Sequence, residues 1–482
     1  MRTVKISTTL LLSLFTISCT NHTKETSSAK LKNEIDRYLT KTMEIHNIPG
    51  LALAVVEGDK IVYEGYFGIA TLESNVKVDK NTLFRVFSTT KLITSTGIFQ
   101  LIQDGKLSLE DKISKYLDNL PLQWQEIKIG TLLSHSSGLP DIIKYNSSLT
   151  DKELMDKLSK DKMEFVAGNQ FRYNQTNYWL LARIIEKVTG VSFDEYILQN
   201  QFKNSKNGVR FSSNAQEEIA NRATRYSYNN AMKLFEKDTN NNGKRGHSGN
   251  GLNITLDKFI EWNRQLDNNI LLDQQTKFKM WTPFTFTNQK DSFLYGWGNY
   301  HVNKLPSYGF SGGNLAAFRK FVDQKTTIIL LSNGYEIPAY DIIVNDIARI
   351  VIPDLKGSTL EEEVMDLILK SRFDKAALSF KNLKKENPNS DFENLKWNVN
   401  SLGNSHLYSE HNTDKALEVF KFNAESNPDW WISLASLAEI YEVKKDSANA
   451  IENYQKAILL NGTNEMNYNE HMKSRIKTLQ GN

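Results

Sequence analysis

The segment FRVFSTTKLIT, Phe84–Thr94, decides how this chain is interpreted, because it places Lys91 three residues after Ser88. A serine hydroxyl is inert at neutral pH unless a neighbouring group removes its proton, and a partly desolvated lysine one helical turn away can do so. The spacing alone is weak evidence, since Ser27 with Lys30, Ser159 with Lys162 and Ser474 with Lys477 share it. On spacing alone, Ser88 is better explained as a helix N-cap.

The surroundings of Ser88 distinguish it from the other three serines. The run KLITSTGIFQLI, Lys91–Ile102, is apolar nearly all round and predicts a buried helix that ends at Asp104-Gly105. Ser88 follows a β-like turn segment and opens this helix, so Lys91 shares its face. The helix N-terminus adds positive potential and a backbone N–H for a developing oxyanion.

Strand patterns stand at both ends of the region 31–353, with helical patterns between them. The run Gly50–Gly68 predicts a hairpin around Gly58-Asp59, and Lys325–Gly334 predicts a central strand. The run Thr176–Gly190 has the periodicity of an amphipathic helix that ends at a glycine. We therefore expect an α+β domain in which the two ends of the region meet in one sheet.

Six segments in order resemble the serine hydrolases related to class C β-lactamases and penicillin-binding proteins. They are Phe84–Pro121, Thr131–Asp141 (TLLSHSSGLPD), Phe171–Gly190 (FRYNQTNYWLLARIIEKVTG), Gly249–Trp262, Leu294–Gly298 (LYGWG) and Tyr308–Phe318 (YGFSGGNLAAF). The resemblance covers about residues 31–353 and is more specific than any single motif. It implies an antiparallel sheet flanked by helices.

The resemblance also implies the catalytic residues. Ser88 would be the nucleophile, Lys91 its base and Tyr173 a proton shuttle. The N–H groups of Ser88 and Gly313 would form the oxyanion hole. Gln175 and Ser311 would orient the substrate amide or carbonyl.

Two positions depart from the family pattern. Gln175 stands where an asparagine is expected, and Phe310 replaces the lysine or histidine that precedes x-Gly, here Ser311-Gly312. A cation at Phe310 would favour phenolate at Tyr173 and attract a substrate carboxylate. Its loss removes about 1.5–3 kcal/mol of such binding, which shifts substrate preference without abolishing acyl transfer. A degenerate, inactive site is the alternative interpretation of Phe310.

These residues predict an acyl-enzyme hydrolase of ester, amide or D-amino-acid peptide substrates that is poor on β-lactams. Two alternatives remain open: a non-catalytic envelope binding or scaffold protein, and a true penicillin-binding D-Ala peptidase or β-lactamase. No cofactor and no metal site are expected. The start of a calcium loop at Asp238–Gly246 lacks its twelfth-position glutamate and is better explained as a surface loop. His135 is interpreted as a packing histidine, not a base.

The N-terminus resembles an export signal. Residues 1–19 contain Arg2 and Lys5, a short apolar run, and Cys19, the one cysteine of the sequence. The run is shorter than the roughly 20 residues a membrane helix needs. Ile17-Ser18-Cys19 is similar to the cleavage box of bacterial lipoproteins, so we expect lipidation of Cys19, a polar tether over 20–30, and a membrane-anchored protein of the cell envelope. A plain signal peptide is the alternative.

The region 354–482 is predicted to be all-α, with tetratricopeptide-like repeats. Ala416, Phe420 and Pro428 recur as Ala450, Tyr454 and Gly462 after 34 residues, and Ala376, Phe380 and Pro388 form an earlier copy. A generic helical tail is the alternative. Such repeats bind proteins or peptides, and Trp430 and Trp431 are expected to fill their core. With Lys+Arg 59 against Asp+Glu 56, nucleic acid is not expected as a partner.

Overall fold

The computed structural model describes residues 11–203, 205, 207–229, 232–288, 293–303, 305–335, 340–355, 360–388, 390, 392–462 and 468–481, with 11–27, 335, 340, 393, 394 and 409 as backbone only. Cys19, expected to be lipidated, therefore lies outside the described side chains, as do residues 1–10 of the expected signal. The backbone of residues 20–30, expected as a tether, belongs to helix α1 (Leu11–Ile45). Among the described residues, no helix combines the length and the apolar character that crossing a bilayer requires.

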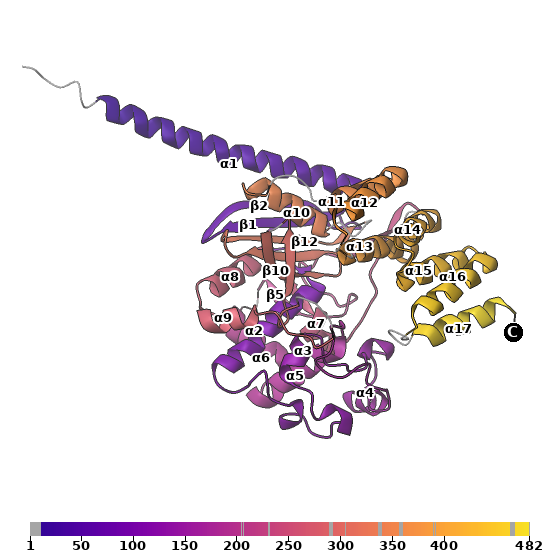
Figure 1. The fold of residues 1–482 in the computed structure, drawn as a ribbon. Helices are drawn as coiled ribbons and strands as arrows, with labels where there is room; N and C mark the ends of the chain where they lie inside the picture. Colours follow the sequence, from indigo (N-terminus) through magenta and orange to yellow (C-terminus); the bar gives the residue numbers. More distant parts are fainter. Residues whose placement is uncertain are drawn as a thin grey trace, which may run out of the picture.

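A seven-stranded antiparallel sheet forms the centre of the N-terminal domain (Figure 1), with strand order β3-β2-β1-β12-β11-β10-β9. Its strands are β1 (Gly50–Glu57), β2 (Lys60–Thr71), β3 (Val76–Lys77), β9 (Gly298–Val302), β10 (Leu305–Gly312), β11 (Ala316–Phe321) and β12 (Thr326–Ser332). Leu51 pairs with Ser332, and Glu57 pairs with Thr326. The predicted meeting of the two ends of the domain is confirmed.

Both faces of the sheet are buried, which explains why β1 reads as an unbroken apolar run. One set of its side chains, Leu51, Leu53 and Val55, packs with helices α1 and α10 (Tyr340–Val351). The alternate set packs on the opposite face, against the helices that carry the candidate site. The alternation follows from the two-residue period of a strand.

The opposite face carries most of the helices of the domain (Figure 1). They are α2 (Thr90–Gln103), α3 (Ile129–Leu133), α4 (Asp151–Leu158), α5 (Gln175–Thr189), α6 (Phe193–Phe202), α7 (His247–Asn250), α8 (Leu256–Asp267) and α9 (Gln274–Met280). The predicted helices at Lys91–Ile102 and Thr176–Gly190 correspond to α2 and α5. Gly190 ends α5 with a left-handed φ of 76°.

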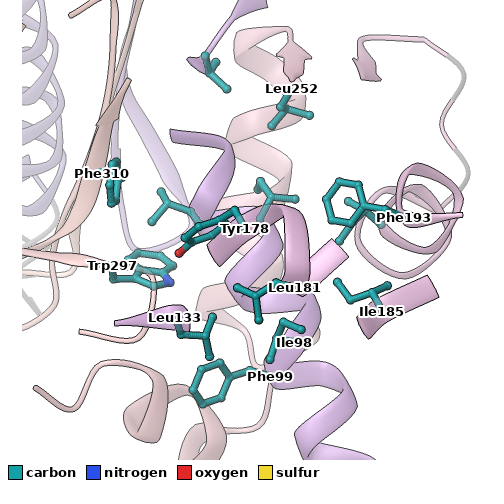
Figure 2. Close-up of a cluster of buried hydrophobic side chains, with 14 of the residues drawn as sticks. Ile98, Phe99, Leu133, Tyr178, Leu181, Ile185, Phe193, Leu252, Trp297 and Phe310 are labelled. Carbon is teal, nitrogen blue, oxygen red and sulfur yellow. The ribbon is translucent and has the colours of Figure 1, made fainter. Parts of the chain in front are cut away.

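Helices α2 and α5 pack against each other in the hydrophobic core, to which both contribute side chains (Figure 2). Ile98 and Phe99 of α2 lie beside Tyr178, Leu181 and Ile185 of α5, all buried in one cluster. The α2 helix is enclosed on nearly every side, as its apolar sequence predicts. This burial fixes the start of α2, where Ser88 and Lys91 lie.

Two small sheets complete the domain. Their strands are β4 (Phe84–Arg85), β5 (Val209–Phe211) and β8 (Leu252–Ile254) in one, and β6 (Tyr226–Asn229), β7 (Leu234–Lys237) and β13 (Gly334–Tyr335) in the other. Strand β4 pairs with β8, which brings the Ser88 segment next to the end of α7.

The C-terminal region is helical, as predicted, and lies beside the sheet (Figure 1). Its helices are α11 (Leu360–Leu369), α12 (Phe373–Glu386), α13 (Glu393–Asn404), α14 (Thr413–Ser426), α15 (Trp431–Val443), α16 (Ser447–Leu460) and α17 (Tyr468–Leu479), with a π-helical turn η6 (Ser405–Ser409) after α13. The alanines and aromatic residues of the predicted repeats are buried in α12, α14 and α16. Trp431 is buried, whereas Trp430 is half-buried against Trp397.

We expect Phe318→Ala to lower the free energy of unfolding by about 3–5 kcal/mol, because it leaves a cavity in the core. Phe318 is 0% exposed, and its ring centroid lies 5.2 Å from that of Phe259 and 5.9 Å from that of Trp297. Denaturant titration followed by circular dichroism measures the loss. Leu122→Ala is the control, since Leu122 is 82% exposed and should change stability little.

Candidate active site

Ser88 lies in a 3-10 turn, η1 (Phe87–Thr89), directly before α2. The preceding residue, Phe87, has a φ of 45°, an uncommon value for a non-glycine residue. The guanidinium groups of Arg85 and Arg225 lie 4.4 and 5.5 Å from the Phe87 ring centroid. Their contacts hold the turn that presents the Ser88 hydroxyl.

The loop that resembles a calcium site stabilises this turn instead. The Asp238 carboxylate, with a side chain 2% exposed, lies 3.4 Å from Arg85 and 3.5 Å from Arg225. Both of its cationic partners are protein side chains, so the carboxylate compensates two partly or fully buried guanidinium groups. Asn240, Asn241 and Asn242 are exposed, in agreement with a surface loop.

Three predicted residues converge on one atom. The Tyr173 hydroxyl donates to Ser88 Oγ at 2.7 Å, and Lys91 Nζ lies 3.5 Å from the same oxygen. Lys91 Nζ also lies 4.8 Å from the Tyr173 ring centroid. The arrangement brings a nucleophile, an amine and a phenol within hydrogen-bonding reach.

Lys91 is 0% exposed, and desolvation lowers its pKa to about 7, opposed by the nearby Asp141 carboxylate. Besides Ser88, Lys91 Nζ donates to Gly249 O at 3.0 Å and to Gln175 Oε1 at 3.2 Å. A neutral amine has two N–H bonds, which these two acceptors satisfy, so its lone pair is left for Ser88. The geometry therefore gives Lys91 the position of a general base.

Desolvation shifts the pKa of Tyr173 in the opposite direction from that of Lys91. Desolvation raises the pKa of its hydroxyl above the ordinary value, although 37% of the residue is exposed. A protonated phenol that donates to Ser88 Oγ cannot also be the base in the unliganded site. Tyr173 is suited to deliver or relay a proton.

Gln175, which departs from the family pattern, contacts Lys91. As the first residue of α5, it points its amide oxygen to Lys91 Nζ, so the longer side chain still reaches the lysine. Its backbone N–H donates to the Asp141 carboxylate at 3.2 Å. The oxygen is thus occupied by the lysine, rather than free to orient a substrate.

Strand β10 closes the site with two glycines. A Cβ on Gly312 would lie 2.0 Å from Val86 O and 2.9 Å from the Ser88 nitrogen, so the close approach of β10 to the serine turn requires glycine. Gly313 follows with a φ of 57° and is exposed. Its position agrees with the predicted oxyanion hole beside Ser88.

Ser311 does not join the site, and the sequence prediction for it is wrong. It pairs with Ala317 on the sheet face covered by α1 and α10, and its hydroxyl contacts Arg319 Nη2 at 2.6 Å and Asp341 Oδ1 at 3.1 Å. Arg319 and Asp341 form an ion pair there. Because side chains alternate along a strand, Phe310 and Ser311 face opposite ways.

Phe310 faces the site and makes it aromatic. Its ring centroid lies 6.3 Å from that of Tyr173 and 6.1 Å from that of Phe293. In the described part of the chain, the cation in contact with Ser88 and Tyr173 is the buried Lys91. The side chain that β10 places beside the phenol is therefore apolar and uncharged.

His135 is a packing residue, as expected. It is buried, with a left-handed φ of 55°, and its Nδ1 accepts from the Asn174 backbone N–H at 3.1 Å. Its ring centroid lies 4.5 Å from that of Tyr173. Desolvation lowers its pKa well below the ordinary range, so it stays neutral and supports the Tyr173 segment.

Sequence reasoning missed Asn250. Its Oδ1 accepts from the Ser88 hydroxyl at 3.1 Å, and its Nδ2 donates to Gln175 Oε1 at 3.4 Å. The signal was present in the segment Gly249–Trp262, whose first two residues both contact the site. Among the described residues, no group of three or more His, Cys, Asp or Glu side chains is arranged to hold a metal ion.

We expect the rate at which a fluorophosphonate labels Ser88 to rise with pH through about 7, because Lys91 must lose its proton to act as base. Above that pH the rate levels off. Lys91→Met should slow labelling by about 10²–10⁴-fold and remove the pH dependence.

Lys320→Met is the matched control, because Lys320 is also buried but binds Asp267 and Thr327 instead. In the Lys320→Met variant, the labelling rate should rise with pH around the same midpoint as in the wild type. If the labelling rate of Lys91→Met still rose with pH around the wild-type midpoint, the result would contradict the role of Lys91 as base.

A family model described as Beta-lactamase matches residues 35–351. Penicillin-binding protein 4* of Bacillus subtilis is 27% identical over 325 residues, 62% of this chain and 71% of that protein. Protein flp of Staphylococcus aureus is 28% identical over 181 residues, and the match spans only 36% of the length of each chain.

Solved structures share the fold. The octameric penicillin-binding protein homologue from Pyrococcus abyssi has a TM-score of 0.59 at 21% identity, covering 67% of this chain and 77% of that chain. The D-amino acid amidase from Ochrobactrum anthropi has a TM-score of 0.56 at 17% identity, covering 68% and 98%. EstCE1, a hydrolase with promiscuous acyltransferase activity, has a TM-score of 0.58 at 16% identity, covering 67% and 99%.

Proposed function

The chain belongs to the beta-lactamase family, and on that premise we propose that it is a serine hydrolase acting through a covalent acyl-enzyme. Members of this family are serine hydrolases, and proteins similar in fold include a D-amino acid amidase and a hydrolase with promiscuous acyltransferase activity. The observation that carries the proposal is the convergence of Tyr173 Oη and Lys91 Nζ on Ser88 Oγ.

The reaction begins when the neutral Lys91 amine takes the Ser88 proton and Oγ bonds to the carbonyl carbon of the substrate. The carbonyl oxygen becomes an oxyanion that the N–H groups of Ser88 and Gly313 stabilise. The bond to the leaving group then breaks, and the leaving group takes a proton through Tyr173 or Lys91. Water attacks the acyl-enzyme by the same proton route in reverse.

The proposed substrates are esters, amides or D-amino-acid peptides whose group beside Tyr173 is uncharged. Phe310 stands where a cation would bind a substrate carboxylate, and the aromatic contacts with Tyr173 and Phe293 support an apolar preference. We therefore propose weak activity on β-lactams. The similarity to penicillin-binding protein 4* favours the alternative of a penicillin-binding peptidase.

We expect a fluorophosphonate to label wild-type protein at Ser88, while a fluorescent penicillin reacts poorly. Phe310→Lys should increase the penicillin reaction about ten- to a hundredfold, because it restores a carboxylate-binding cation. In-gel fluorescence followed by peptide mass spectrometry locates each adduct.

Ser88→Ala is the control and should react with neither reagent. Efficient hydrolysis of penicillin by the wild type would contradict the proposed preference. Absence of a Ser88 adduct with both reagents would leave a non-catalytic binding protein as the better interpretation.

We also propose that the protein is exported and held at a membrane by a lipid on Cys19. The support is the sequence of residues 1–19, in which Cys19 is the sole cysteine of the chain. In a bacterial host, we expect an alkyne-tagged fatty acid to label the wild type and the protein to sediment with membranes. Cys19→Ser should abolish both. A soluble, unlabelled wild type would refute the anchor.

A further inference from the structure

Asn250 is the one polar side chain in contact with Ser88 Oγ, among the described residues, to which the sequence assigns no role. It is the last residue of α7, a half-buried asparagine 3.1 Å from Ser88 Oγ and 3.4 Å from Gln175 Oε1. Since a carboxamide offers both a donor and an acceptor, its chemistry depends on which end faces the serine.

The neighbouring hydrogen bonds fix that orientation. Lys91 Nζ donates whether it is protonated or neutral, so the end of Gln175 that faces it is the oxygen Oε1. The end of Asn250 that faces the same oxygen must then be the NH₂ group. Asn250 Oδ1 consequently faces Ser88, and it accepts the one proton that the serine hydroxyl has to donate.

The orientation of the Asn250 amide determines where the Ser88 proton lies in the unliganded site. The Ser88 proton points to an amide oxygen that is not a base at neutral pH, while the Tyr173 hydroxyl donates to Oγ and Lys91 Nζ lies 3.5 Å from the same oxygen. Transfer of the proton to Lys91 requires the hydroxyl to rotate away from Asn250. The partly buried amide oxygen would then lose its partner, which costs about as much as one hydrogen bond.

A hydrogen-bond donor on the substrate removes this cost. We propose that Asn250 is a substrate-recognition residue of the serine site: its Oδ1 holds the Ser88 proton until an N–H of the substrate, next to the scissile carbonyl, takes that place. The inference rests on the proposed serine hydrolase function and names its substrate class as acylamino or amino-acid derivatives. Simple alkanoyl esters lack the donor and react more slowly.

The position of Asn250 does not depend on its own side chain. The neighbouring Ser248 hydroxyl donates to Tyr178 O at 2.8 Å, and the Ser248 carbonyl accepts from Thr94 at 2.7 Å. At the other end of α7, His247 pairs with Asp194 at 2.9 Å. These contacts hold the helix from α5, α2 and α6, so a substitution at Asn250 should leave its backbone in place.

The test compares two p-nitrophenyl esters, of N-acetylglycine and of butanoic acid, with wild type, Asn250→Ala and Asn250→Leu. The leucine variant removes both hydrogen bonds at nearly constant volume. We expect wild type to prefer the N-acetylglycine ester by about tenfold in kcat/KM, and both variants to lose most of that preference. Melting temperatures verify that the variants are folded.

Fluorophosphonate labelling gives a second readout, because that reagent carries no N–H beside the reacting centre. Freeing the Ser88 proton should make Asn250→Ala react about fivefold faster than wild type. A merely structural asparagine would give slower labelling on removal. Asn200→Ala is the matched control, since the Asn200 side chain donates to the Tyr196 carbonyl within α6, and it should match wild type in both assays.

The outcomes separate this inference from the function on which it rests. No reaction of wild type with the phosphonate overturns the serine hydrolase proposal and this inference with it. A reactive wild type whose ester preference and labelling rate are unchanged in both Asn250 variants overturns the role of Asn250 alone, as does slower labelling with an unchanged preference.

Discussion

The burial of one ammonium group sets the chemistry of this site. Lys91 is fully enclosed between α2, α5 and α7, with Gly249 O and Gln175 Oε1 as its fixed acceptors. Burial without a carboxylate partner in direct contact makes the neutral amine accessible near neutral pH, because the desolvation cost of the charge falls on the protonated form. In the proposed mechanism the folded core therefore supplies the free energy that activates the serine, and the helices around Lys91 are as necessary as Ser88 and Tyr173.

The same reasoning explains why Phe310 is compatible with an intact serine site. A cation on β10 would influence the Tyr173 hydroxyl and any bound carboxylate, but the amine that accepts the proton lies on α2 and is held by α5 and α7. The proposed oxyanion donors are backbone N–H groups of Ser88 and Gly313, which a side chain at position 310 would not replace. Activation and substrate selection are thus carried by different elements of one site, so one can change while the other persists.

The sequence predicted those features that lie in short segments which follow one another in the same order as in the family. Ser88, Lys91 and Tyr173 lie within such segments, and β1 meets β12 because apolar runs stand at both ends of the domain. Ser311 was placed wrongly, although the two-residue period of a strand already puts it on the face opposite Phe310. Asn250 was missed although it lies in one of these segments, because its contact with Ser88 arises only when β4 pairs with β8. The lowered pKa of Lys91 likewise results from burial by distant segments.

The pairing of β1 with β12 also constrains how the domain folds. Leu51 and Ser332 are neighbours in the centre of the sheet, yet nearly the whole hydrolase sequence lies between them. Such a topology has a high contact order, and the entropy of closing so long a loop is lost before the pairing stabilises the chain. The serine turn depends on β10, which reaches β1 only through β11 and β12. A chain still emerging during synthesis would hold all of its catalytic side chains and no active site until its last strand arrived.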